Sequence, residues 1–265
     1  ETVVADCDVD AANMYLLTDP KMISKHDFYS GYRAVISHEK CEGCGVCMTV
    51  CHFNAIYPEK DVYTVSELSC EGCGYCTKGC PDHAIEMVKV KAGEVYISRT
   101  RMNNYLVHAR LGIASDMSGK LVTEVRREAK KVALEKHAQY ILIDGSPGIG
   151  CPVTASLTGA DYAVLVTEPT KPAIHDLKRV MGVVEKFRMR AGIIINKSDL
   201  SIRLVQEIKN YARKKSVPVL VELPYDIGFS SAINRGITMV EADNTFIREK
   251  IKSAWYNLLM LIQVN

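Results

Sequence analysis

Two copies of one cysteine spacing constrain this chain more than any other feature of its sequence. Each copy reads C-x2-C-x2-C-x3-C, and together they hold eight of the ten cysteines, all within residues 41–80. Thiols gathered in this way indicate metal binding in a reducing compartment rather than a disulfide framework. The first copy is formed by Cys41, Cys44, Cys47 and Cys51, and the second by Cys70, Cys73, Cys76 and Cys80.

The spacing fits iron–sulfur clusters. Three thiolates at this pitch on a tight turn can bind three irons of a cubane, and glycines between them let backbone amides approach the sulfides. Structural zinc is the alternative, but it explains neither the third cysteine of each copy nor the repeat. Residues of about 33–91 resemble a bacterial-type 2x(4Fe-4S) ferredoxin over their whole length. The resemblance implies one cluster on Cys41, Cys44, Cys47 and Cys80 and a second on Cys51, Cys70, Cys73 and Cys76, because the fourth cysteine of each run binds the other cluster.

Outside the cysteine block, the pattern is that of an α/β protein. Short apolar runs rich in β-branched residues alternate with amphipathic stretches, which predicts βα units and a parallel sheet. We expect helices over 118–137, 172–190 and about 245–262. The last could be a membrane-surface anchor or a helix packed on the sheet, and its polar face lacks the dense Lys and Arg of such anchors, which favours packing on the sheet. The expected strands are residues 2–6, 140–144, 162–168, 191–196 and 217–223. The cysteine block therefore interrupts one α/β domain, which gives three parts: 1–32, the inserted 33–91, and 92–265.

Composition narrows the class of protein. A chain of 265 residues that is 48% apolar can bury a substantial core. The net charge of +2 and the scattered Lys and Arg give no sign of nucleic acid or an acidic membrane surface as a partner. The sequence contains no apolar run long enough for a membrane span and no secretory signal, so we expect a cytoplasmic location.

Polar residues follow the expected strands at their carboxyl ends, where open parallel sheets bind ligands. An apolar run that ends in Asp144 is typical of a Walker B strand, which presents a carboxylate to Mg²⁺, and the glycine-rich turn after it can move with the state of a γ-phosphate. The side-chain amide of Asn196, which follows an expected strand, can contact a purine base. The candidate nucleotide-site residues are Asp6, Asp8, Asp144, Pro147, Gly148, Asn196, Pro224 and Asp226.

In order, the segments VVADCDVDAAN, DGSPGIG, TEPT, INKSD and LPYD resemble the switch I, Walker B/switch II and base-binding segments of MinD/ParA-type P-loop ATPases. The resemblance implies a P-loop NTPase-like parallel sheet with helices on both faces, interrupted by the ferredoxin module after switch I. It also implies ATP, ADP and Mg²⁺ as ligands and a nucleotide-dependent homodimer. Asp8 would orient the attacking water, Asp6 and Asp144 would hold Mg²⁺, Asn196 would meet adenine, and Pro224 and Asp226 would border the base.

The phosphate-binding loop of this family is absent from the sequence. The nearest segment, GIASDMSGKL, has six residues between Gly112 and Gly119 instead of four, and Leu121 replaces the Ser or Thr that binds Mg²⁺. We expect Ser118 to be a helix N-cap and Lys120 to lie on the surface or at a dimer face. Two explanations stay open: an N-terminal strand, loop and helix outside this sequence, or loss of the ATPase site with retention of the ferredoxin.

Two cysteines stand outside the repeat. Cys7 lies between Asp6 and Asp8 and therefore points to the opposite face of its strand, where we expect it to be buried. Cys151 follows the switch II turn, in a region where the related nitrogenase iron protein carries a cysteine that bridges a cluster between subunits. A bridging thiol and a buried thiol are the two interpretations of Cys151.

The sequence therefore predicts an ATP-dependent iron–sulfur protein. With its phosphate loop present, it would hydrolyse ATP to ADP and phosphate and so gate electron transfer, or cluster delivery, to a redox partner or an iron–sulfur acceptor protein. Electron transfer is favoured because each cluster has four ligands from one chain. The alternative is a non-catalytic ferredoxin-type electron carrier with a degenerate ATPase platform. A positioning ATPase of the cell-division type has no need of two clusters.

Overall fold

The computed structural model describes residues 1–112 and 117–263. Its strands are β1 (Thr2–Asp6), β2 (Lys21–Ile36), β3 (Ile56–Glu59), β4 (Val62–Val65), β5 (Ile85–Arg99), β6 (Tyr105–Leu111), β7 (Tyr140–Asp144), β8 (Tyr162–Thr167), β9 (Arg190–Ile195) and β10 (Val219–Glu222). Its helices are α1 (Tyr15–Thr18), α2 (Val46–Thr49), α3 (Tyr75–Gly79), α4 (Ser118–Glu135), α5 (Cys151–Leu157), α6 (Lys171–Lys186), α7 (Ile202–Lys214), α8 (Gly228–Asn234) and α9 (Thr245–Gln263). The five strands predicted from apolar runs are confirmed as β1, β7, β8, β9 and β10.

The larger sheet is mixed rather than parallel, which corrects the predicted fold class. Its order is β2-β5-β6-β1-β7, in which β1 runs parallel to β6 and β7, whereas β5 runs antiparallel to both β2 and β6. The antiparallel half arises because the chain leaves the body along β2 and returns along β5, beside the strand it left. The prediction missed this pair because β2 is mostly exposed and lacks a buried apolar run.

A second sheet of β10-β9-β8 is fully parallel. Helices α6 and α7 cover it, and their apolar residues, including Met181 and Ile208, share one buried cluster with Ile193 and Ile195 of β9. Within the described ranges β7 and β8 are edge strands of different sheets and do not pair.

Helix α4 packs on the larger sheet and forms the main core. Leu121, Val122, Val125, Ala129 and Val132 recur at helical spacing and are all at most 4% exposed, so one stripe of the helix faces β1, β6 and β7. The predicted helix over 118–137 is thus confirmed, with its end at Glu135.

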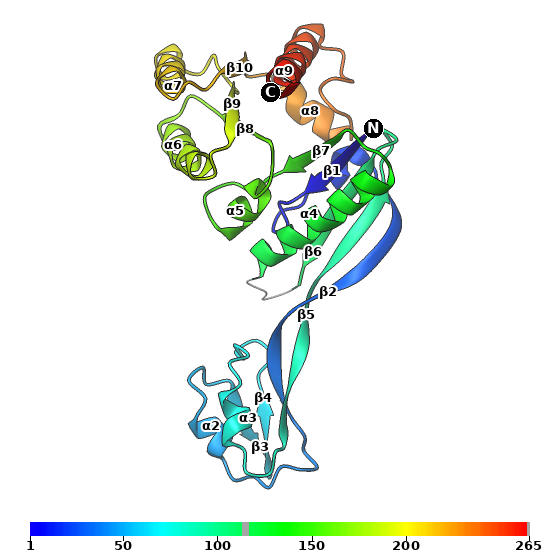
Figure 1. The fold of residues 1–265 in the computed structure, drawn as a ribbon, viewed down its shortest axis with the longest axis vertical. Helices are drawn as coiled ribbons and strands as arrows, with labels where there is room; N and C mark the ends of the chain where they lie inside the picture. Colours follow the sequence, from blue (N-terminus) through cyan, green and yellow to red (C-terminus); the bar gives the residue numbers. More distant parts are fainter. Residues whose placement is uncertain (113–116, 264–265) are drawn as a thin grey trace.

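The strands β2 and β5 form a long antiparallel ribbon that carries the cysteine block away from the body (Figure 1). We call residues 37–84, with the strand ends that flank them, the cysteine module, and we call the β2–β5 ribbon the arm. The module has its own buried cluster, formed by Ala34, Ile36, Cys47, Ile56, Cys76 and Ile85. The limits 33 and 91 of the predicted insertion both fall inside these two continuous strands.

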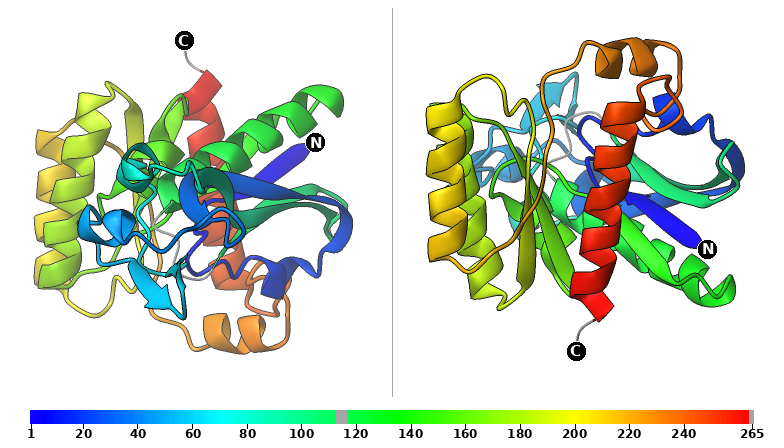
Figure 2. Two further views of the ribbon diagram at one scale, coloured as in Figure 1. Left: turned by 90° about the horizontal axis from the view of Figure 1, so that it is seen from below. Right: turned by 90° about the horizontal axis from the view of Figure 1, so that it is seen from above.

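The module and α9 lie at opposite ends of the long axis (Figure 1), so the module is in front of the body when seen from below and α9 is in front when seen from above (Figure 2). Helix α9 packs on β10: the Asn257 amide donates a hydrogen bond to the Leu220 carbonyl, and Trp255 contacts Tyr140 of β7 edge to face. Among the described residues, no helix is both long enough and apolar enough to cross a membrane.

Candidate nucleotide and cluster sites

Three predicted carboxylates meet where β1 and β7 end. Asp6 and Asp144 are the last residues of these strands and are partners in the parallel register. Asp6 is 1% exposed, and one of its oxygens accepts a hydrogen bond from the Asp8 backbone N–H at 3.2 Å. Two strand ends and the first turn after β1 therefore bring the candidate Mg²⁺ and water ligands together.

Ionisation of this carboxylate group is electrostatically unfavourable. Burial and the nearby Asp144 raise the pKa of Asp6 from 3.8 to about 6. Burial, with a contribution from Asp8, also raises the pKa of Asp144. Neighbouring negative charges in a poorly solvated place disfavour ionisation, and a bound divalent cation would reverse that effect.

Backbone contacts hold this corner of the sheet together. The Cys7 N–H donates to the Asp144 carbonyl at 2.8 Å, and the Ser146 hydroxyl donates to the Cys7 carbonyl at 2.9 Å. The Cys7 side chain is fully buried, as predicted, and burial raises the pKa of its thiol to about 12. Cys7 is therefore a packing residue whose main chain links the segments after β1 and β7.

The glycine-rich turn after β7 is open. Gly148 has φ +90°, and a side chain there would meet no atom within 4 Å. Cys151 begins α5 and is exposed, so the interpretation of Cys151 as a buried thiol is wrong. A Cβ on Gly119 would lie 2.9 Å from the Cys151 Cβ, so Gly119 lets the start of α4 approach the start of α5.

The segment around Lys120 differs from the sequence-based expectation in one respect. Helix α4 begins at Ser118, and its N-cap is Met117, which makes no side-chain capping bond. Ser118 is thus the first helical residue and not the cap. Residues 113–116 of the GIASDMSGKL segment lie outside the described ranges.

The candidate base-binding residues lie on the smaller sheet. Asn196 follows β9 and Pro224 follows β10, and the Ser198 N–H donates to the Leu223 carbonyl, which joins the two loops. Both oxygens of Asp226 already accept hydrogen bonds, from the Gly228 N–H and the Asn244 amide, at 2.7 Å each. Asp226 therefore orders its own loop. In the part of the chain that the structure describes, this sheet does not pair with the one that carries Asp6.

One ion pair at this edge was not anticipated from the sequence. The Lys197 ammonium lies 2.7 Å from the Glu168 carboxylate, which joins the loops after β8 and β9. The TEPT and INKSD segments contain both residues, but their pairing depends on strand order, which spacing along the chain does not reveal.

The two cysteine copies fold alike. In each, two glycines adopt positive φ, the second of them precedes a short helix that carries the third cysteine, and the fourth cysteine accepts a hydrogen bond from an alanine N–H four residues later. The positive-φ glycines are Gly43, Gly45, Gly72 and Gly74. A Cβ on Gly72 would lie 2.0 Å from the Tyr32 carbonyl oxygen, so glycine is required there for the turn to lie against β2.

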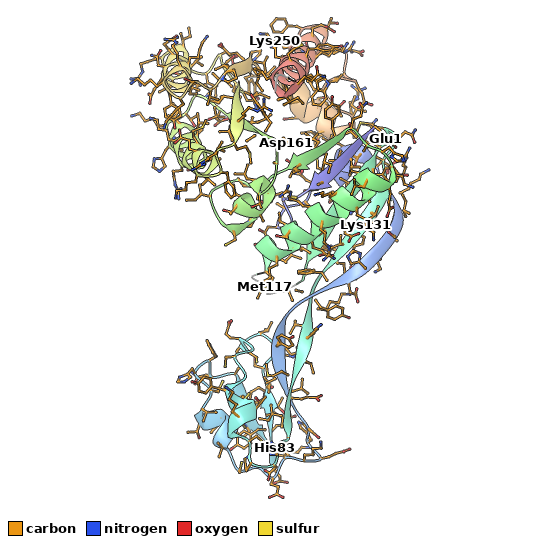
Figure 3. All side chains as sticks on the ribbon, viewed as in Figure 1. Glu1, His83, Met117, Lys131, Asp161 and Lys250 are labelled. Carbon is orange, nitrogen blue, oxygen red and sulfur yellow. The ribbon has the colours of Figure 1, made fainter. Side chains whose placement is uncertain are left out.

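Cysteines of the two copies share one cavity. Cys41, Cys44 and Cys47 of the first copy line it together with Cys80 of the second. Burial raises the pKa of Cys47, with Cys41 and Cys44 contributing, and burial likewise raises that of Cys76, with Cys70 and Cys73 contributing. Each set of three thiols is therefore close-packed, and its thiolates need a compensating positive charge. Figure 3 places this unit far from the body, with His83 near its tip and Glu1 and Lys131 in the body.

The arrangement of the sulfurs is wider than a single-ion site. Four thiolates around one tetrahedral zinc lie roughly 3.8 Å apart, because each Zn–S bond is about 2.3 Å. The described residues contain one group of three or more metal-binding side chains whose ligand atoms all lie within 4.8 Å of one another, and it includes no cysteine. The cysteine geometry therefore suits a ligand larger than one ion.

The chain has an α/β P-loop NTPase fold of the MinD type, in which the parallel strands β1 and β7 end in carboxylates. Among solved structures, the chain is similar to the cell division ATPase MinD of Pyrococcus furiosus (TM-score 0.54, 17% identity, 98% of this chain and 86% of that one). It is also similar to MinD of Pyrococcus horikoshii OT3, solved with Mg-ADP (TM-score 0.53, 17% identity, 100% and 86%). These similarities establish the fold.

Residues 1–239 match the CobQ/CobB/MinD/ParA nucleotide binding domain, and the chain belongs to that family. An uncharacterised protein of Methanocaldococcus jannaschii is 31% identical over 257 residues, which is 97% of this chain and 85% of the relative. The septum site-determining protein MinD of Helicobacter pylori is 28% identical over 122 residues, which is 42% of this chain and 46% of that protein.

Proposed function

We propose that the protein is an ATP-binding iron–sulfur protein in which ATP hydrolysis gates electron transfer, or cluster delivery, through two 4Fe-4S clusters. The observation that carries this proposal is that Cys80 of the second copy lines the same cavity as Cys41, Cys44 and Cys47 of the first. Such crossing of the fourth ligand is the arrangement of two-cluster ferredoxins.

The residues of the cysteine module fit clusters in two further respects. Four positive-φ glycines keep side chains away from the turns that carry the first three cysteines of each copy. Alanine N–H groups donate to the sulfurs of Cys51 and Cys80 at 3.4 and 3.3 Å, and such hydrogen bonds are among the factors that set cluster potential. Bound clusters would supply one-electron transfer. The second cluster would be held by Cys51, Cys70, Cys73 and Cys76.

For the nucleotide, the main support is the group of carboxylates where β1 and β7 end. Asp6 and Asp144 would hold Mg²⁺ and Asp8 would orient the attacking water, while Pro147 and Gly148 form the turn that responds to the γ-phosphate. The raised pKa values of Asp6 and Asp144 indicate a place where a cation offsets clustered negative charge. On the smaller sheet, Asn196 would meet the base, bordered by Pro224 and Asp226.

Among the described strands, β7 and β8 each leave one edge unpaired, which supports a further strand between the sheets. Both strands belong to parallel arrangements, and both expose large apolar side chains, among them Leu142 at 51% and Val166 at 65%. A parallel strand of the protein placed there would satisfy both edges and bury these side chains. We propose that this strand leads into the phosphate loop that would face Asp6 and Asp144.

Coupling between the two sites would run through the arm. β2 starts shortly after the segment that carries Asp8, and β5 returns beside β6, which pairs with β1. Closure of switch I and switch II around ATP between two protomers would therefore shift the base of the arm and present the clusters to a redox partner or an iron–sulfur acceptor protein. The exposed Cys151 would lie at that dimer face, where it is available as a bridging thiol.

The second candidate function is a non-catalytic electron carrier with the α/β body as a docking platform. It is favoured by one observation, that these 265 residues contain no glycine-rich phosphate loop.

Anaerobic isolation of the natural full-length protein tests both candidates. We expect an iron content near eight per chain, the visible absorbance of 4Fe-4S clusters, and binding of Mg-ATP. Asp8→Ala should abolish ATP hydrolysis and leave the absorbance unchanged. Absence of Mg-ATP binding would leave the carrier as the function, and loss of the absorbance in Asp8→Ala would refute the separation of the two sites.

A further inference from the structure

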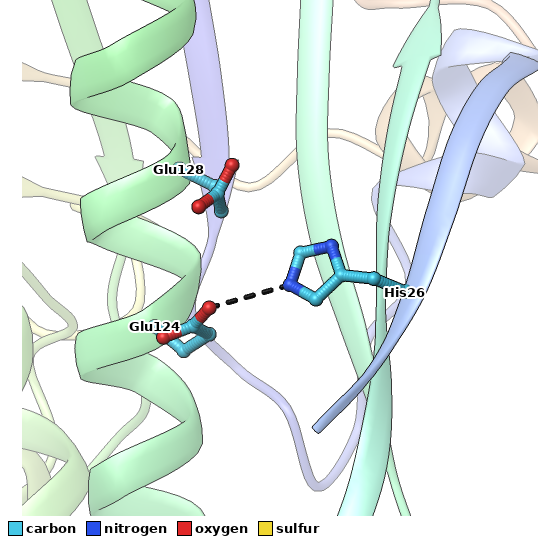
Figure 4. A group of neighbouring side chains, drawn as sticks. All are labelled: His26, Glu124 and Glu128. Carbon is cyan, nitrogen blue, oxygen red and sulfur yellow. Dashed lines mark hydrogen bonds and ion pairs between the residues drawn. The ribbon is translucent and has the colours of Figure 1, made fainter. Parts of the chain in front are cut away.

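Three metal-binding side chains converge where the arm joins the body, away from both sites described above. His26 lies on β2, and Glu124 and Glu128 lie one helical turn apart on α4. One ligand atom from each lies within 4.8 Å of the others, and the imidazole Nε2 is 3.3 Å from a Glu124 oxygen. Figure 4 shows both carboxylates and the imidazole facing one another across the gap between the strand and the helix.

Glu128 is the member of this group that calls for an explanation. It is 8% exposed, and within the described part of the chain its carboxylate accepts no hydrogen bond. Two cations pair with it at the long end of the ion-pair range, Arg127 at 3.8 Å and Lys131 at 3.7 Å, and both of these side chains are largely exposed. A buried carboxylate without hydrogen bonds is costly, and a cation held directly against it removes that cost.

The group is accessible to an ion. His26, Glu124 and Glu128 line an open groove between β2 and α4, and the His26 side chain is 42% exposed. The Arg127 guanidinium occupies part of the position that a metal would take, 2.6 Å from the Glu124 oxygen that faces His26. Because the Arg127 side chain is 70% exposed, it can move into solvent when a metal displaces it.

We propose that His26, Glu124 and Glu128 bind a divalent first-row transition-metal ion, with water completing its coordination. One imidazole nitrogen and two carboxylate oxygens form a mixed ligand set that suits such ions better than Mg²⁺ or Ca²⁺, which prefer oxygen alone. The metal would bridge a strand of the arm and a helix of the body, and so fix the arm at its base. This site is independent of the proposed clusters and nucleotide.

Mn²⁺ alone, without nucleotide, is the probe that tests this site. Mn²⁺ prefers oxygen and nitrogen to thiolate, so the cysteine module interferes little. Free Mn²⁺ is read from its EPR signal during titration of the holoprotein. We expect His26→Asn, Glu124→Gln and Glu128→Gln each to remove one bound Mn²⁺ per chain or to weaken it by more than about tenfold. Glu135→Gln, on the exposed face of the same helix, and His175→Asn, on α6, are matched controls that keep wild-type stoichiometry.

Arg127→Gln is a variant for which we expect Mn²⁺ to bind more tightly rather than more weakly. Removing the competing guanidinium should tighten Mn²⁺ binding, because the metal no longer has to displace it, and the residue is exposed, so the fold is not at risk. Far-UV circular dichroism identifies any ligand variant that fails to fold, and the remaining variants then decide. Equal Mn²⁺ stoichiometry and affinity in the wild type and the folded ligand variants would overturn the proposal, as would unchanged or weaker binding in Arg127→Gln.

Discussion

The α/β body and the cysteine module differ in the interactions that stabilise their folded structures. In the body, α4 and the sheet share a continuous cluster of aliphatic side chains, with Leu121, Val122 and Val125 fully buried. The buried cluster of the module has six members, and two of these, Cys47 and Cys76, are cysteines. So small an apolar core cannot offset the entropy of ordering the turns around it. Under the proposed function the module would therefore depend on its bound clusters, whereas the body depends on burial.

Removing iron tests this difference with the largest expected effect. If the proposed clusters are bound, chelation of the holoprotein should unfold residues 37–84, because the bonds to the clusters would be most of what holds the module, while the body keeps its fold. Limited proteolysis should then cut within the module alone. Cys80→Ser should act like chelation, and Lys78→Ala, at an exposed position of α3, is the control. An iron-free module that resisted protease would show that apolar packing suffices there.

Leu121→Ala is the converse test, because it should destabilise the body and leave the cysteine module intact. Leu121 is a fully buried residue of α4, so truncation should lower the free energy of unfolding of the body by about 3 kcal/mol. Urea denaturation followed by far-UV circular dichroism measures this loss, and cluster absorbance should persist below the transition. Leu134→Ala, on the same helix at 69% exposure, should change stability by less than about 0.5 kcal/mol. Joint loss of the clusters and the body would mean that the two parts unfold as one unit.

Asp6 makes the stability of the body depend on pH. Its pKa is about 6 in the folded protein against 3.8 for the ordinary side chain, so the folded state holds this proton more tightly. The resulting stabilisation is fully present below about pH 4 and is lost as the pH rises through about 6. Without Mg²⁺, Asp6→Asn should therefore be more stable than the wild type at about pH 8, by on the order of 2 kcal/mol.

Urea titrations at about pH 5 and about pH 8 measure that difference. Asp10→Asn, at an exposed position of the same loop, is the control. A wild type as stable at the higher pH as Asp6→Asn would mean that the cost of the Asp6 charge had been overestimated.

Glycine substitutions give the smallest effect. Gly148→Ala should cost about 1 kcal/mol, because φ is +90° there although no atom would contact the new methyl group. Gly182 lies inside α6 with equally open surroundings and no positive φ, so Gly182→Ala should stabilise by about 0.5–1 kcal/mol. Thermal denaturation of the two variants compares them, and shifts of the same sign would contradict the argument from backbone conformation.

Sequence patterns predicted those features of the molecule that depend on residues close together in the chain. The strands β1 and β7 to β10 follow from apolar runs, and the cysteine spacing predicted a shared environment for Cys41, Cys44 and Cys47. The arm was not predicted, since β2 is polar along most of its length and its partner strand lies far along the chain. The group of His26, Glu124 and Glu128 could not be found in the sequence, because 98 residues separate His26 from Glu124.

The arm also sets how the module meets other molecules. A flexible linker would let the module sample a volume, and its effective concentration at any one point would be low. The arm is instead an antiparallel ribbon whose body half is held in the larger sheet, because β5 pairs with β6 over Gly93–Arg99. The free half, residues 29–36 of β2 paired with β5, is roughly 25 Å long and stiffer than a linker. The module is thus confined to a narrow arc at nearly fixed radius, so that a docking surface on that arc meets it at high local concentration and in one orientation.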